Sequence, residues 1–173
     1  MFRSSLDKSR SLEEVMISTA GTTQVLMICT AVLYFKYLAV LVVQGGKKFN
    51  AGTRAPEDMA ASSAIPQQSF GLAPANADSE EYKKAKAEEI RWQRIVGNDM
   101  ENLPFGVLLA WFSVLAGGNT SVTSAAYIIF TVVRVIHTLS FAYGIFWPRT
   151  TAWSIGILAV ITMTINGIVG SIN

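Results

Sequence analysis

The chain has 173 residues, of which 51% are hydrophobic and 15% are charged, and its formal net charge is +2. The hydrophobic residues are concentrated in four long runs separated by polar segments, which excludes an ordinary soluble domain and indicates a membrane protein with several spans. The small net charge argues against a surface for nucleic acids, and the single cysteine, Cys29, rules out an intrachain disulfide and a CxxC metal site. We therefore expect an all-α, integral membrane four-helix bundle that occupies residues 1–173 as a single domain, with no metal site.

The first hydrophobic run predicts a transmembrane helix over about residues 15–43, with Lys36 as its only charged residue. It is far longer than the hydrophobic region of a signal peptide, so we do not expect it to be cleaved. Gln44-Gly45-Gly46 is expected to end this helix, at the start of a loop over residues 44–96. The middle of that loop, from Ala60 to Ala75, predicts little regular structure.

A helix is expected to begin inside this loop, at about residue 79, and to continue into the membrane as a second span over about residues 97–116. Asp78 followed by Glu81 has the character of a capping box. Glu80 and Lys84 are spaced i,i+4, which supports an exposed helix. The sequence therefore predicts one long helix with a polar first half and an apolar second half.

The apolar part of this helix starts only at Leu103 and is too short to cross a bilayer, since a span needs about 20 residues. The polar residues before it, Asp99 among them, are then drawn to or below the membrane surface, where charges are costly and usually mark a site. Four of these residues are spaced 3, 4 and 3 and share one helical stripe: Arg91, Arg94, Asn98 and Glu101. Apolar residues continue the stripe: Phe105, Leu108 and Phe112. This pattern favours a pocket for an amphipathic ligand, and the alternative is a hydrogen-bonded seam between helices.

The third and fourth spans are expected over about residues 123–146 and 151–172, joined by a turn at Trp147-Pro148. Arg134 lies near the centre of the third span, where facing lipid would cost at least about 2.5–3.5 kcal/mol. It must therefore face the bundle and meet a carboxylate or a carbonyl, and Glu101, Asp99 or a carboxylate of a ligand would serve. His137 follows one turn later, and we favour a place in the same site over simple packing.

The basic residues predict the topology. Nine of them fall in the loop between the first two spans and in the turn between the last two, whereas three precede the first span. The positive-inside rule then puts the side of the membrane with these nine basic residues in the cytoplasm. Cationic groups outnumber anionic ones near this edge, which favours a small ligand with carboxylates held by arginines.

Three motifs on these four runs resemble the MAPEG family, the membrane-associated proteins of eicosanoid and glutathione metabolism. They are Arg94-x-x-x-Asn98-Asp99-Met100-Glu101-Asn102, Arg134-x-x-His137-Thr138 and Pro148-Arg149. Lys47-Lys48-Phe49 and Ala55-Pro56-Glu57-Asp58 resemble the family's first loop. The nearest branch is the one that holds microsomal glutathione transferase 1 and microsomal prostaglandin E synthase.

The resemblance implies a homotrimer in which glutathione binds between subunits near the cytoplasmic face and a lipophilic substrate arrives from the bilayer. Arg149 would be the catalytic arginine that stabilises the thiolate of glutathione, the co-substrate. The residues at glutathione-binding positions would be Arg94, Asn98, Glu101, Arg134, His137, Lys47 and Thr150.

The expected function is that of a glutathione transferase, with or without glutathione peroxidase activity, acting on lipophilic electrophiles or lipid hydroperoxides in the endoplasmic reticulum membrane. Val96, Gly97 and Phe141 depart from the prostaglandin synthase branch, so a prostaglandin E synthase-like isomerase is an alternative rather than the first choice. A non-catalytic lipid-binding member of the same family is another alternative, and a small channel or transporter is a third, weaker one.

Overall fold

The computed structural model describes residues 2–61, 67–72 and 77–173. The described residues form four α-helices: α1 (Phe2–Asn50), α2 (Glu80–Leu115), α3 (Thr120–Ala142) and α4 (Phe146–Ile172). A short 3-10 helix, Pro56–Ala61, lies between α1 and α2. Half of the segment expected to lack regular structure, residues 62–66 and 73–75, falls outside the described residues, whereas Ala60 and Ala61 belong to the 3-10 helix.

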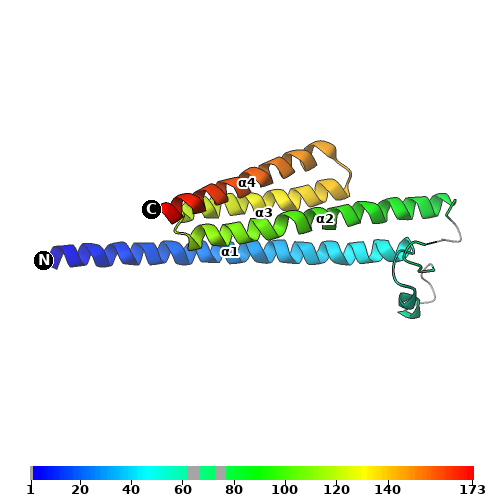
Figure 1. Cartoon of the computed structure of the whole chain (residues 1–173), viewed down its shortest axis with the longest axis horizontal. Coiled ribbons are helices and arrows are strands. Elements are labelled where there is room, and N and C mark those ends of the chain that lie inside the picture. Colours follow the sequence, from blue (N-terminus) through cyan, green and yellow to red (C-terminus); the bar gives the residue numbers. More distant parts are fainter. Residues whose placement is uncertain (1, 62–66, 73–76) are drawn as a thin grey trace.

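The helices form one elongated bundle (Figure 1). α3 and α4 are the shorter pair, whereas α1 extends beyond them at one end and α1 and α2 both extend beyond them at the other. Three helical segments of the described chain are long and apolar enough to cross a membrane: Ala20–Asn50, Thr120–Ala142 and Phe146–Ile172. α2 is not among them, because charged residues fill its first half and Asp99 and Glu101 immediately precede its apolar half.

The first three helices end in the same way, with a glycine in the left-handed conformation just beyond the last turn. Gly52, Gly117 and Gly144 have φ values of 66°, 80° and 72°. At the end of α3, the Gly144 amide donates to the Phe141 carbonyl at 3.1 Å and the Ile145 amide to the Ser140 carbonyl at 2.8 Å. This pair of bonds is the Schellman motif, which satisfies carbonyls that a helix end would leave free.

These ends correct three expected boundaries. α1 does not end at Gln44-Gly45-Gly46 but continues to Asn50. α3 ends at Ala142 rather than near residue 146. α4 begins at Phe146, so that Pro148 lies in its first turn, where a proline's missing amide hydrogen costs nothing.

The starts of α2 and α3 are capped by side chains. The Ser79 hydroxyl accepts a hydrogen bond from the Tyr82 amide at 3.1 Å, so the cap is Ser79 and not Asp78. The Asn119 side chain accepts from the amides of Ser121 and Val122 at 3.0 and 3.1 Å. Such caps satisfy amides that the first turn cannot pair within the helix.

The apolar core lies where α1, α2, α3 and α4 meet in the half of the bundle away from the long loop. Its largest fully buried members are Tyr127, Phe130, Leu26, Leu33 and Met163. Gly106 lies directly under the Phe130 ring, so that a Cβ at this position would overlap it. The core therefore holds α2 close to α3 just below the polar segment of α2.

Candidate functional site

α2 carries the predicted polar stripe across the bundle, but its members point to different places. Arg94 and Glu101 are exposed and Asn98 is half-buried, whereas Asp99, which follows Asn98 and is not part of the stripe, is fully buried. The stripe therefore divides into an outward part and a part that faces α3.

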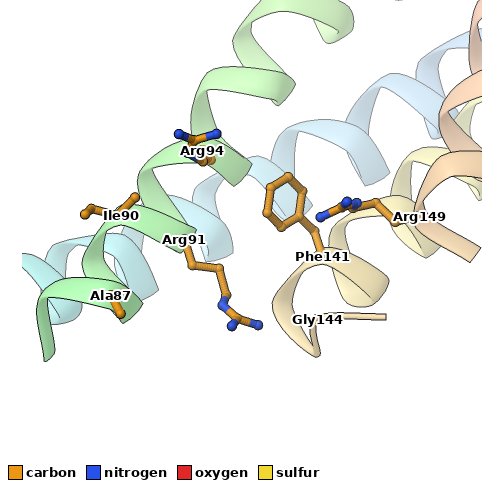
Figure 2. A pocket seen from close by; sticks show the side chains of 7 residues that line it. All are labelled: Ala87, Ile90, Arg91, Arg94, Phe141, Gly144 and Arg149. Atoms are coloured by element: carbon orange, nitrogen blue, oxygen red, sulfur yellow. The ribbon is translucent and has the colours of Figure 1, made fainter. Parts of the chain in front are cut away.

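Two residues of the stripe, Arg91 and Arg94, line a recess of about 350 Å³ between α2, the end of α3 and the start of α4. Its lining contains three arginines, two of them from α2 and one from α4 (Figure 2). The full set of lining residues is Ala87, Ile90, Arg91, Arg94, Phe141, Gly144 and Arg149. None of these lining residues is acidic, so the recess is suited to an anionic ligand.

Arg149 is positioned by the first turn of α4 and by two aromatic rings. Its guanidinium carbon lies 4.7 Å from the centroid of the Phe141 ring and 5.8 Å from that of Phe146. An arginine over an aromatic face is attracted by the ring's quadrupole, and Figure 2 shows the Arg149 side chain directed toward Phe141. The stacking leaves the guanidinium hydrogens free to meet a ligand. Thr150, the next residue, is exposed and does not line the recess.

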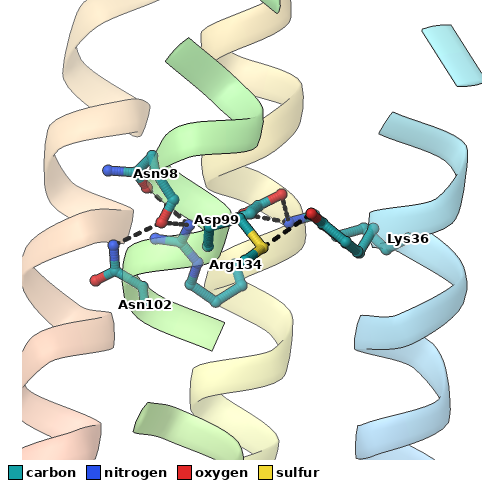
Figure 3. Close-up of polar contacts among 7 residues, drawn as sticks. Lys36, Asn98, Asp99, Asn102 and Arg134 are labelled. Carbon is teal, nitrogen blue, oxygen red and sulfur yellow. Dashed lines mark hydrogen bonds and ion pairs between the residues drawn. The ribbon is translucent and has the colours of Figure 1, made fainter. Parts of the chain in front are cut away.

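The buried part of the polar segment forms a cluster of three charges on three helices (Figure 3). The Lys36 ammonium lies 2.6 Å from both Asp99 carboxylate oxygens, and an Arg134 Nη2 lies 2.8 Å from Oδ1. The side chains of Asp99 and Arg134 are each 1% exposed. Two cations share one carboxylate, so the cluster carries an excess positive charge below the surface of the bundle.

Arg134 also holds the backbone and side chain of Asn98. Its Nη2 donates to Asn98 Oδ1 at 2.7 Å and to the Asn98 carbonyl at 3.4 Å. The same carbonyl accepts from Asn102 Nδ2 at 2.7 Å. Of the expected partners for Arg134, the one found within the chain is Asp99 and not Glu101.

His137 is buried, with 3% of its surface exposed, and does not line the recess. It contacts Phe141, which does line the recess. Its ring meets the Phe141 ring edge-on at 5.9 Å between centroids. Three buried atoms on this face of α3 have no hydrogen-bond partner: His137 Nδ1, Thr138 Oγ1 and Arg134 Nε. Phe141 thus separates the buried polar face of α3 from the Arg149 guanidinium.

Lys47, at the end of α1, reaches the mouth of the recess through Glu88. Its ammonium lies 3.3 Å from one Glu88 oxygen, and the other Glu88 oxygen lies 3.7 Å from Arg91 Nε. Of the eight residues predicted for the site, the structure brings Arg94 and Arg149 together in the recess. The others lie around it or on separate faces of the single chain.

Three features were missed from the sequence. The helix spacing places Arg91 on the stripe but does not mark it as a site residue, and Lys36 stands out only as the one charged residue of the first span. Gly144 was not noticed at all. The signal for the recess wall was present, because Ala87, Ile90, Arg91 and Arg94 have the i, i+3, i+4, i+7 spacing of one helix face.

Comparison with known families gives one result. The model of the MAPEG family matches residues 25–169. This range contains every residue of the recess and of the buried charge cluster. No curated protein matches the chain.

Proposed function

The chain belongs to the MAPEG family, a family of glutathione-related membrane proteins, and we propose from this premise that it is a glutathione transferase. The observation that carries the proposal is the recess lined by three arginines and no acidic residue. Its volume of about 350 Å³ is within the roughly 300–1,000 Å³ of small-molecule pockets. A tripeptide with two carboxylates and a thiol matches this lining in charge.

Arg149 is the residue proposed to act on sulfur. A free thiol has a pKa of about 8.5, and a guanidinium beside it lowers that pKa and raises the thiolate fraction at neutral pH. The thiol proton leaves to water, and the thiolate sulfur attacks an electrophilic carbon. A C–S bond forms as the leaving group departs with its electron pair. The same thiolate would attack the peroxide oxygen of a lipid hydroperoxide, and a second glutathione would then complete the reduction to an alcohol, water and glutathione disulfide.

Arg94 is proposed to hold a carboxylate of the tripeptide beside Arg149. For Arg134 the buried geometry favours a different role from the expected one, that of a positioning residue. It holds Asn98 at 2.7 Å, and through Asn98 it fixes the part of α2 that follows Arg94. His137 would likewise act through its contact with Phe141.

Glu101 supports the proposal that the working unit is a homotrimer with glutathione between subunits. It is an exposed carboxylate at the start of the apolar half of α2, where lipid contact would be costly. The exposed Phe105, Leu108 and Phe112 continue from it along the helix. A neighbouring subunit and the ammonium group of bound glutathione would cover Glu101. The apolar stripe would receive the lipophilic substrate. Thr150, also exposed, would meet ligand only in such an assembly.

We propose that the protein resides in the endoplasmic reticulum membrane, as the resemblance implies, and that its recess faces the cytoplasm. The orientation is supported by the place of the recess at the end of the bundle that carries most basic residues. The test uses protein purified in detergent. Conjugation of glutathione to a generic aryl halide, together with saturable glutathione binding by calorimetry, is the expected result. Absence of both turnover and binding would refute the proposal.

A second candidate is a non-catalytic, lipid-binding member of the family. The observation in its favour is Phe141, whose ring supplies no hydroxyl to the recess. Calorimetry separates the two readings, since a lipid-binding protein without glutathione affinity would show no heat of binding. A prostaglandin E synthase-like isomerase would bind glutathione but would isomerise an endoperoxide substrate in place of conjugating an aryl halide.

A further inference from the structure

Arg91 lies on the same wall of the recess as Arg94, one helical turn closer to the long loop. Its guanidinium points toward the turn between α3 and α4 (Figure 2). Nη1 donates to the Ala142 carbonyl at 3.3 Å, and a Cβ on Gly144 would come within 2.8 Å of the same nitrogen. The bare glycine therefore leaves the space that this guanidinium occupies at the mouth of the recess.

A carboxylate already lies near this guanidinium. Glu88 Oε1 is 3.7 Å from Arg91 Nε, and the second oxygen of Glu88 is shared with Lys47. The side chains of Arg91 and Glu88 are 38% and 37% exposed, so water weakens their attraction. An incoming carboxylate can compete with Glu88 for Arg91, because the Arg91–Glu88 distance is long, Glu88 also pairs with Lys47, and both side chains are partly exposed to water.

The two ends of glutathione differ in what they need. The γ-glutamyl end carries an ammonium beside its carboxylate and requires an acidic partner, which the recess lining does not supply. Glu101, proposed to hold this ammonium, is ten residues further along α2 than Arg91, about 15 Å along the helix axis. The glycine end carries a carboxylate alone. A lining with three arginines and no acidic residue therefore suits the glycine end, with the thiol next to Arg149.

We infer that Arg91 is an anion-binding residue at the mouth of the recess and that it takes the glycine carboxylate of glutathione, with Glu88 as a competing intramolecular anion. The inference rests on the proposed function and adds a specificity-determining contact to it. It also assigns opposite effects to two neighbouring residues. Loss of the Arg91 charge weakens binding, whereas loss of the Glu88 charge strengthens it.

The experiment measures equilibrium binding by calorimetry with two probes, glutathione and its glycine monoethyl ester, which lacks the negative charge at that end. Arg91→Gln is expected to weaken glutathione binding by about tenfold and to leave ester binding nearly unchanged, because a contact to a charged group is lost only for the first probe. Glu88→Gln is expected to strengthen glutathione binding about two- to fivefold, with no gain for the ester. Arg91→Lys, which keeps the charge, serves as the matched control and should lose less than Arg91→Gln.

A role confined to capping α3 would weaken both probes equally in Arg91→Gln and would give no gain in Glu88→Gln, and that result overturns the inference. If the Arg91 variants lose their folded state, judged by size-exclusion chromatography and circular dichroism, Glu88→Gln decides alone. If the wild type binds glutathione and the variants bind it with unchanged affinity, this inference is wrong and the proposed function is unaffected. No binding by the wild type removes both.

Discussion

Replacement of Asp99 by asparagine is the sharpest test of the buried charge cluster. Asp99 is the single carboxylate between Lys36 and Arg134 among the contacts of the described residues, and it is 1% exposed. The cluster now carries two positive charges and one negative charge, and Asp99→Asn leaves two positive charges without a counter-ion. Breaking a buried ion pair by removing one partner costs about 3–5 kcal/mol.

The cost should appear as a lower unfolding temperature in detergent. One kcal/mol shifts the midpoint by about 2–4 °C for a chain of this size, so the expected fall is about 6–20 °C. Lys36→Met is the matched control, since it leaves a neutral Asp99–Arg134 pair and should cost far less. Asp99→Asn combined with Lys36→Met should recover part of the loss. A midpoint for Asp99→Asn within 2 °C of the wild type, or a Lys36→Met loss as large as that of Asp99→Asn, would show that the cluster is not the stabilising element described.

Three further predictions concern the recess and the core beneath it. Phe141→Leu should reduce conjugation about two- to fivefold by removing the ring under Arg149, whereas Phe141→Tyr should retain the rate; equal rates in both variants would contradict the stacking argument. Gly144→Ala should lower the free energy of unfolding by about 1–2 kcal/mol, because its backbone is left-handed and the added Cβ meets Arg91, and chemical denaturation that shows no loss would refute this. Gly106→Ala should cost about 1–3 kcal/mol by forcing a methyl group against a buried aromatic ring, and an unchanged melting temperature would show that the core yields at this point.

The sequence predicted the helices but misplaced several of their ends, for a physical reason that is visible at particular glycines. Gly45 and Gly46 looked like a helix end, yet a glycine inside a helix costs only about 1 kcal/mol, and α1 continues through both of them to Asn50. Gly144 marks the true end of α3, because only glycine takes the left-handed conformation there without strain. Pro148 looked like a breaker and is instead part of the first turn of α4.

The site was predictable in its residue types but not in its pairings. The central position of Arg134 required a buried carboxylate, but the sequence could not choose between Asp99 and Glu101. The two are separated by two residues, or about 200° around a helix, so the choice depends on how α2 is rotated. The structure turns Asp99 inward and leaves Glu101 exposed. Side-chain packing between helices decides such a rotation, and the residue spacing within one helix does not reveal which side of that helix faces its neighbours.

The proximity of Arg94 and Arg149 could be predicted from the family resemblance but not from the spacing of residues along the chain. The two residues lie on helices far apart in sequence, and no periodicity within the chain relates them. They were assigned to one site only through the family resemblance, and the structure brings both to the lining of one recess. Arg91, one turn from Arg94, follows from the helix spacing alone and was passed over because the resemblance did not include it.

The central claim is that an arginine-lined recess binds glutathione and ionises its thiol. The most direct measurement is the ultraviolet difference spectrum of detergent-solubilised protein titrated with glutathione at neutral pH. We predict a saturable thiolate absorbance in the wild type that is lost in Arg149→Ala, while size-exclusion chromatography shows an unchanged assembly. Saturable glutathione binding without thiolate absorbance, or an absorbance that survives in Arg149→Ala, would contradict it.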